Sequence, residues 1–188
     1  MRKIILLMGM SVDGYNAGGW FPREEIQRSE VLHEIWNQLA SIDTFIMGRV
    51  SYQLWFDVWP GLRDSESQFE ATFSRFADDV EKIVISNTLT ASEWRNSSVI
   101  GGDIRSKLIE LKQQPGKDIA IVGGAKVAQT IGKLDLIDEY RLWLRPVILG
   151  KGTSLFDTPS KAVDVTLIEA KTFRSGLIAL HYTRADKG

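Results

Sequence analysis

Cysteine is absent from this chain of 188 residues, and histidine occurs only at His33 and His181. A chain without cysteine forms no disulfide, offers no thiolate to a metal ion and has no cysteine nucleophile. Two histidines are too few for a multi-histidine metal site, and we interpret both as structural residues. The sequence therefore predicts a protein without a metal centre.

An excess of charge of either sign is also missing, because 23 Lys and Arg residues face 24 Asp and Glu residues, for a net charge of -1. Nucleic-acid binding depends on a basic excess that neutralises phosphates, so we expect no nucleic-acid partner. The apolar run at residues 4–10 is about half as long as a membrane span. It reaches Asp13 without the small-residue cleavage site of a signal peptide. We expect no membrane association and a cytoplasmic location.

Short apolar runs alternate with helix-like segments along the first two thirds of the chain. Such runs are typical of strands buried on both faces of a sheet, and they lie at residues 4–10, 44–47, 82–86 and 119–122. Residues 163–172 and 177–184 are expected to pair across a short turn at 174–176. The sequence thus predicts one domain over residues 1–188. Its α/β fold has a central mixed, mostly parallel sheet with helices on both faces and antiparallel C-terminal strands.

Aromatic residues help to place the expected helices. A helix of about 17 residues is expected after Pro22, with Trp36 on its core stripe. A second, short helix should end near Trp55. The phenylalanines at positions 69, 73 and 76 have the spacing of one helix face. Leu155 and Phe156 are expected to return to the core.

Two glycine-containing turns each join a strand to a helix and predict a binding site for phosphate. Gly123 and Gly124 separate the run at 119–122 from a helix-like segment, and Gly48 with Arg49 occupies the equivalent place after residues 44–47. Glycines let the backbone approach a phosphate, and the N–H groups of a helix start favour negative charge. Either turn could also be only a tight connection. Two on one domain suggest a ligand with several phosphates, such as a dinucleotide.

A third pair, Gly101 and Gly102, is interpreted differently because Asp103 follows it. This carboxylate is placed to cap the next helix, and its fixed negative charge would compete with a phosphate. No acidic residue follows Gly124 for ten positions, and Lys126 lies nearby. We therefore assign a structural role to residues 101–103 and a binding role to the turn at Gly124.

Six segments together resemble the dihydrofolate-reductase-like proteins, in particular the C-terminal reductase domain of the bifunctional riboflavin-biosynthesis deaminase/reductase. The resemblance covers residues 2 to about 182. The segments occur in the family's order at residues 11–14 (Ser-Val-Asp-Gly), 47–52 (Met-Gly-Arg-Val-Ser-Tyr), 85–89 (Ile-Ser-Asn-Thr-Leu), 121–125 (Ile-Val-Gly-Gly-Ala), 136–140 (Leu-Ile-Asp-Glu-Tyr) and 145–152 (Arg-Pro-Val-Ile-Leu-Gly-Lys-Gly). The resemblance implies a three-layer dihydrofolate-reductase-like fold, an NADPH cofactor, a small-molecule substrate and a homodimer. The zinc signature of the deaminase partner is absent from this sequence.

The resemblance also implies a set of residues that bind the cofactor. Arg49 can hold a phosphate by a bidentate contact and Ser51 offers a hydroxyl at a helix start. The full set is Gly48, Arg49, Ser51, Ser86, Asn87, Thr88, Gly123, Gly124, Ala125 and Lys126. Many relatives have a cation in the turn at 86–88, where this chain has Asn87. We favour NADPH because of Arg49, and NADH stays open.

The substrate side of the site is less defined by the sequence. Asp13 is a candidate acid or substrate anchor at the end of the first strand, with an Asx-turn role as the alternative. Trp20 and Trp55 could stack on a planar heterocycle, and Lys151 could bind a substrate phosphate. Glutamates at positions 25, 30 and 34 lie on the expected first helix, but none is assigned a role.

Three functions stay open on the sequence alone. The first is an NADPH-dependent reductase that transfers hydride to a small heterocyclic substrate, of the 5-amino-6-(5-phosphoribosylamino)uracil reductase kind. The second is a dihydrofolate reductase, disfavoured because no helix carboxylate matches with certainty. The third is a protein that binds a nucleotide cofactor without turnover. Hydride transfer depends mainly on geometry, so the sequence is a poor guide to the chemistry.

Overall fold

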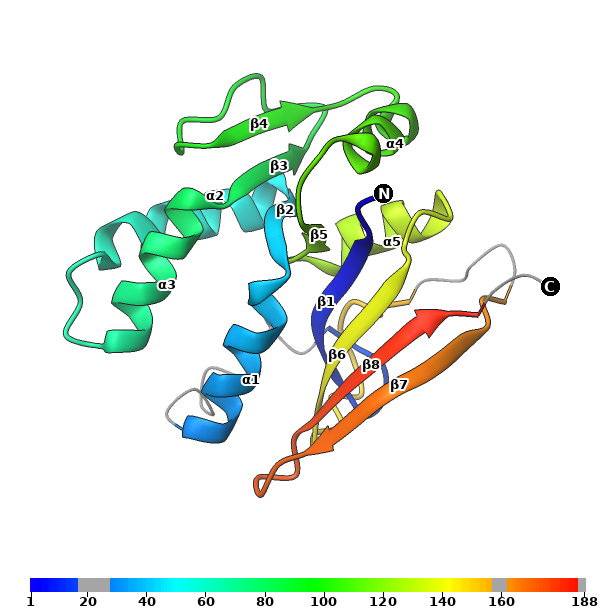
Figure 1. Cartoon of the computed structure of the whole chain (residues 1–188). Helices are drawn as coiled ribbons and strands as arrows, with labels where there is room; N and C mark the ends of the chain where they lie inside the picture. The colour runs from blue at the N-terminus through cyan, green and yellow to red at the C-terminus, as the bar shows by residue number, and fades with distance from the viewer. Residues whose placement is uncertain (17–27, 157–161, 186–188) are drawn as a thin grey trace.

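A computed structural model describes residues 1–16, 28–156 and 162–185, and eight strands in this part of the chain form one sheet (Figure 1). The strands lie in the order β4-β3-β2-β5-β1-β6-β8-β7. Neighbours from β4 to β6 are parallel, whereas β8 is antiparallel to both β6 and β7. The predicted mixed, mostly parallel sheet with antiparallel C-terminal strands is confirmed.

The elements follow the predicted alternation of strands and helices. The strands are β1 (Ile4–Ser11), β2 (Ile42–Gly48), β3 (Glu81–Ile85), β4 (Ser97–Ile100), β5 (Asp118–Ile121), β6 (Glu139–Arg145), β7 (Val165–Thr172) and β8 (Ile178–Arg184). The helices are α1 (Ser29–Ala40), α2 (Arg49–Val58), the 3-10 helix η2 (Trp59–Leu62), α3 (Gln68–Asp79), α4 (Ile104–Gln113) and α5 (Ala125–Lys133).

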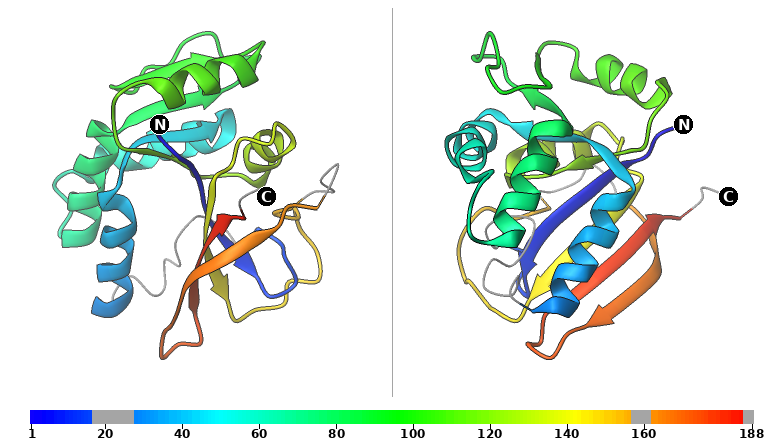
Figure 2. Two further views of the ribbon diagram at one scale, coloured as in Figure 1. Left: turned by 45° about the vertical axis from the view of Figure 1, so that its right-hand side comes forward. Right: turned by 60° about the vertical axis from the view of Figure 1, so that its left-hand side comes forward.

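Helices cover both faces of the parallel part of the sheet. Buried side chains of α1, α2 and α3 belong to one core cluster, and those of α4 and α5 belong to the other. On β1, Leu7 joins the first cluster while Leu6 and Met8 join the second, because successive strand side chains point to opposite faces. Figure 2 shows α1 and α3 together on one side of β1. Burial on both faces explains why β1 is a continuous apolar run.

An aromatic cluster fills the core between α2, α3 and β2. Phe73 is fully buried, and its ring centroid lies 4.4 Å from that of Trp59 and 5.8 Å from those of Trp55 and Phe69. Trp36 packs its ring against Phe69 and Phe76. The predicted helix face of phenylalanines and the core position of Trp36 are confirmed.

Two features of the described chain differ from the sequence prediction. Helix α2 continues past Trp55 to Val58 and leads directly into η2, because the aromatic side chains of both pack on the same core. Leu155 is buried as expected, but Phe156 is 47% exposed. Residues 17–27 lie outside the described part, and with them the expected helix start after Pro22.

Candidate functional site

The predicted phosphate-binding turns lie at the carboxyl ends of the parallel strands. Together with the segments that follow the neighbouring strands they form a row, which consists of residues 86–88, 48–49, 123–124 and 11–14. Strands β3, β2, β5 and β1 are consecutive neighbours, so at about 4.8 Å per strand this row is about 14 Å long. Strand β5 leads to α5 on one face of the sheet, whereas its neighbours β2 and β1 lead to α2 and α1 on the other. Ligands of α/β sheets bind in the crevice where neighbouring connections diverge in this way.

The two predicted glycine turns meet at Ser51. Gly123 has a φ of +100°, a conformation that L side chains rarely adopt. A Cβ atom on Gly123 would lie 2.6 Å from both Cβ and Oγ of Ser51, which stands on the first turn of α2. Backbone conformation and space therefore both require glycine at position 123. The backbone of one turn lies directly against the helix start of the other.

Both helix starts at this point keep their backbone N–H groups free of side-chain caps. The N-cap residues are Gly48 for α2 and Gly124 for α5, and neither helix has an acidic residue in its first turn. By contrast, α3 and α4 are capped by the side chains of Ser67 and Asp103. Uncapped N–H groups with the positive end of the helix dipole form an anion-binding site. Two of them side by side suit a ligand with two phosphates.

Basic side chains stand beside these helix starts. Arg49 is exposed, and its guanidinium donates to Oε1 of Gln53 at 2.8 Å. In the described part of the chain it makes no ion pair with a carboxylate. Lys126 is exposed on the first turn of α5, beside the buried, small Ala125. Both cations can therefore turn toward an anion at the edge of the sheet.

The turn at 86–88 packs against the third glycine pair. Ser86 Oγ accepts the N–H groups of Thr88 at 3.1 Å and Leu89 at 2.9 Å, so this hydroxyl shapes the turn. Asn87 Oδ1 accepts the N–H of Gly102 at 3.4 Å, and a Cβ atom on Gly101 would lie 2.8 Å from the Ser86 carbonyl oxygen. The predicted structural role of residues 101–103 is confirmed, since Asp103 caps α4 by accepting the N–H of Ser106. Asn87 and Thr88 remain exposed beside the row.

Asp13 lies at the far end of the row and is an acceptor of backbone hydrogen bonds. Its carboxylate accepts the N–H groups of Leu149 at 3.1 Å and Gly150 at 2.7 Å. The Ser11 hydroxyl, and then these two N–H groups, lower the pKa of Asp13 to about 2. A carboxylate with this pKa is ionised at neutral pH and carries no proton to donate. These bonds are not those of the Asx-turn alternative, in which the carboxylate would accept the N–H of Tyr15, because that N–H donates to Ser11 Oγ at 3.0 Å.

The candidate substrate residues are more scattered. Lys151 is exposed, one position beyond the contact of Asp13 with Gly150. Trp55 is half-buried, and its ring packs on Phe45 and Phe73 in the aromatic core. Trp20 lies outside the described residues. The structure thus joins Lys151 to the end of the row, gives Trp55 a packing role, and leaves the substrate contacts of all three as predictions.

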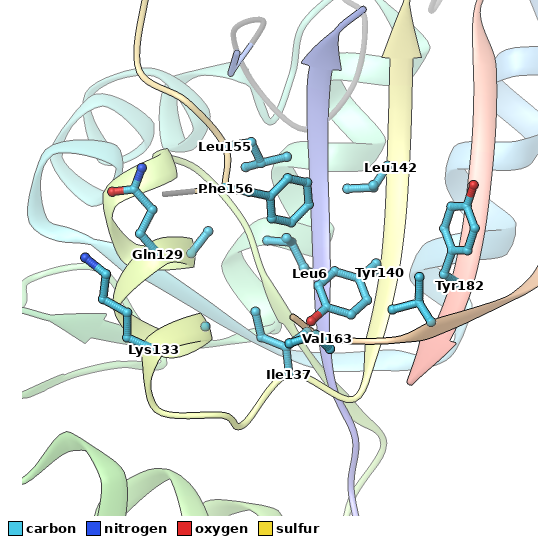
Figure 3. A pocket seen from close by; sticks show the side chains of 13 residues that line it. Leu6, Gln129, Lys133, Ile137, Tyr140, Leu142, Leu155, Phe156, Val163 and Tyr182 are labelled. Atoms are coloured by element: carbon cyan, nitrogen blue, oxygen red, sulfur yellow. The ribbon is translucent and has the colours of Figure 1, made fainter. Parts of the chain in front are cut away.

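A separate apolar cavity of about 310 Å³ opens on the α5 side of the sheet, away from the row of turns (Figure 3). It is lined by Ala128 and Gln129 of α5, by Leu6, Leu142 and Tyr182 of the sheet, and by Phe156. Burial raises the pKa of Tyr140, which also lines it. The cavity borders β6, β8 and β7 on the face of the sheet opposite α1, which contacts the other face through the ion pair of Glu34 with Lys171.

Comparison with known proteins identifies the family. The model of the RibD C-terminal domain matches residues 2–179. The chain belongs to this family. An uncharacterized protein of Bacillus subtilis (strain 168), YyaP, is 31% identical over 189 residues, which is 96% of this chain and 94% of YyaP. The RibD C-terminal domain is a reductase domain, so the expected family is confirmed.

Solved structures confirm the dihydrofolate-reductase-like fold of this RibD C-terminal domain protein. A protein of Shewanella sp. PV-4 with a provisional riboflavin-biosynthesis name matches with a TM-score of 0.74 at 21% identity, over 99% of this chain and 100% of its own. Dihydrofolate reductase of Enterococcus faecalis, complexed with NADP(H) and RAB-propyl, has a TM-score of 0.62 at 11% identity, over 98% of this chain and 97% of its own. The Thermotoga maritima diaminohydroxyphosphoribosylaminopyrimidine deaminase/5-amino-6-(5-phosphoribosylamino)uracil reductase has a TM-score of 0.62 at 14%, over 98% of this chain and 57% of its own.

The sequence did not predict one cluster of charged side chains, which is centred on the buried Glu139. Glu139 on β6 is 5% exposed and pairs with Lys3 at 2.6 Å, with His181 at 3.0 Å and with Arg141 at 3.3 Å. Burial raises the pKa of Glu139, but its bonds with Lys3 and His181 outweigh burial and leave it lowered. The alternation of Glu139 and Arg141 within a strand was the available signal.

Among the described helices, none is both long and apolar enough to cross a bilayer.

Proposed function

We propose that the protein is an NADPH-dependent reductase whose dinucleotide lies along the row of turns. The observation that carries this proposal is the contact of Gly123 with Ser51, which sets two uncapped helix starts side by side. The pyrophosphate would be held by the N–H groups after Gly48 and Gly124. Arg49 would neutralise a phosphate, and the turn with Asn87 would border the adenosine.

The residues present fit such a cofactor. The backbone beside Ser51 is glycine where any Cβ would intrude, and Ala125 is buried and small, so the phosphates can approach the chain closely. NADPH supplies the hydride in this chemistry. The contribution of the chain is to bind the cofactor, to hold a substrate against its reactive end near β1 and β6, and to exclude water there.

For the substrate, we propose a small heterocycle with a ribosyl phosphate, of the 5-amino-6-(5-phosphoribosylamino)uracil kind. Hydride would be added to C1 of the sugar while the bond between C1 and the ring oxygen breaks, and the released oxygen would take its proton from water because Asp13 is ionised. Lys151 would bind the substrate phosphate. A dihydrofolate reductase is less well supported, because Glu34 of α1 already pairs with Lys171 at 3.0 Å and accepts the amide of Gln38. We expect the reaction to take place in the cytoplasm, because the sequence shows no signal-peptide cleavage site after its first apolar run.

The cofactor proposal is tested with Arg49→Ala. NADPH binding is measured by quenching of tryptophan fluorescence, with Arg75→Ala as a matched control because Arg75 is also exposed but lies on α3. We expect Kd to rise at least tenfold in Arg49→Ala, about 1.4 kcal/mol, and to stay within twofold in the control. Absence of saturable NADPH binding by the wild type would exclude the reductase. Binding without oxidation of NADPH by any heterocyclic substrate would favour the cofactor-binding alternative.

We also propose that the partner is a second copy of this chain, bound on the uncovered side of β6, β8 and β7. Val165, Leu167 and Phe156 are 42%, 50% and 47% exposed around the apolar cavity. Leu167 lies opposite Tyr182 in the ladder, on the face that contains the cavity. Two sheets commonly pack face to face, and a two-fold dimer buries the same patch on both copies.

The dimer is tested by sedimentation of the wild type and Leu167→Lys. We expect a wild-type dimer and a monomeric variant. Leu54→Lys is the control, because Leu54 is 62% exposed on α2, far from this face. A wild type that is monomeric at every concentration would contradict the proposal.

A further inference from the structure

Two segments that follow neighbouring strands are joined along their length at the far end of the row. Residues 11–16 follow β1 and residues 147–155 follow β6. Val12 N–H donates to the Val147 carbonyl, Asn16 N–H to the Thr153 carbonyl and Leu155 N–H to the Gly14 carbonyl, each at 2.9 Å. These bonds fix both ends of the second segment and leave its tip, residues 148–152, between them.

The tip itself is held by one side chain. Within the described part of the chain, the N–H groups of the tip that have partners are those of Leu149 and Gly150, and both donate to Asp13. Gly150 has a φ of +69° and Gly152 a φ of +143°, so the tip follows a path that only glycine adopts readily. Asp13, Leu149 and Gly150 are all exposed. Core packing therefore does not determine the position of the tip, and the two hydrogen bonds do.

We propose that Asp13 is a positioning residue that holds the tip, and with it Lys151, against the end of β1. This inference rests on the proposed function, because the tip borders the place where substrate would meet the cofactor. The carboxylate acts through the backbone of Leu149 and Gly150 and transfers no proton. It determines how well a substrate is held, whereas the phosphates of NADPH would contact the turns that follow β2 and β5.

The test compares Asp13→Asn with Asp13→Ala. An asparagine keeps one oxygen that can accept an N–H group, whereas an alanine keeps none. We expect hydrogen exchange of the Leu149 and Gly150 amides to be fastest in Asp13→Ala, at least tenfold above the wild type, and intermediate in Asp13→Asn. The kcat/KM for substrate should fall in the same order, mainly through KM. Asp64→Asn, an exposed acid beside α3, serves as the control.

A proton donor would behave differently. Asparagine and alanine would then abolish kcat equally, exchange of the tip would match the wild type, and the pH profile of kcat would lose one limb. That pattern, or unchanged exchange in Asp13→Ala alone, would overturn the proposal. Exchange is measured without cofactor, so failure of the wild type to bind NADPH would count against the reductase and not against the role of Asp13.

Discussion

Replacing Gly123 with alanine perturbs the point where the two helix starts meet. The backbone at φ +100° costs a residue with a Cβ about 2 kcal/mol. The new Cβ would also lie 2.6 Å from Cβ and Oγ of Ser51, and such overpacking costs about 1–3 kcal/mol. We expect the free energy of unfolding to fall by about 3–5 kcal/mol and NADPH affinity to fall at least tenfold.

Urea denaturation and fluorescence titration measure both effects. Gly124→Ala is the matched control for stability, because its Cβ would meet Ser51 Oγ at an ordinary 3.5 Å and its φ is -82°. Adding Ser51→Gly to Gly123→Ala removes the clash but not the backbone strain. The double variant should therefore regain about 1–3 kcal/mol of stability. Unchanged stability and affinity in Gly123→Ala would refute the close contact on which the cofactor site rests.

Three further predictions concern the cofactor, a buried lysine and the aromatic core. NADPH should bind more tightly than NADH, and Asn87→Arg should widen the difference by adding a cation; equal Kd values in the wild type would contradict this. Burial lowers the pKa of Lys82 to about 8, below its ordinary value of 10.5. Between pH 8 and pH 10.5 the Lys82 amine is protonated in the unfolded chain but neutral in the folded protein. The free energy of unfolding, compared with that of Lys82→Met, should therefore rise with pH by up to about 1.4 kcal/mol per pH unit. Denaturant unfolding at pH 7 and 10 should show this rise, and a constant difference would exclude it. Phe73→Ala should cost about 3–5 kcal/mol by calorimetry, whereas a loss below 1 kcal/mol would show a plastic core.

Much of the fold could be predicted from local sequence patterns. The buried strands could be recognised because both faces of β1 and β5 are covered, which makes their sequences continuously apolar. The end of β6 at Arg145 is less clear in the sequence, since residues 147–149 are also β formers and only Pro146, which has no N–H group to extend the ladder, interrupts them. The exposure of Phe156 was missed, because an aromatic residue beside an open cavity has the same sequence signature as a core residue.

Only part of the candidate site could be predicted from the sequence. Glycine turns after strands are visible in the sequence, and the parallel topology brings them to one edge of the sheet. The contact of Gly123 with Ser51 spans 72 positions and depends on β2 and β5 being neighbours. The bonds of Asp13 with Leu149 and Gly150 likewise depend on β1 lying beside β6. Sequence spacing does not reveal such contacts, so Asp13 was predicted by position and its hydrogen bonds were not.

The most direct test of the cofactor site is an NMR titration of the 15N-labelled protein with NADPH. We predict that the largest amide shifts fall on residues 48–51 and 123–126, with smaller ones at 86–88. Shifts confined to the cavity between α5 and β6, or no shifts at all, would contradict a dinucleotide site along the row of turns.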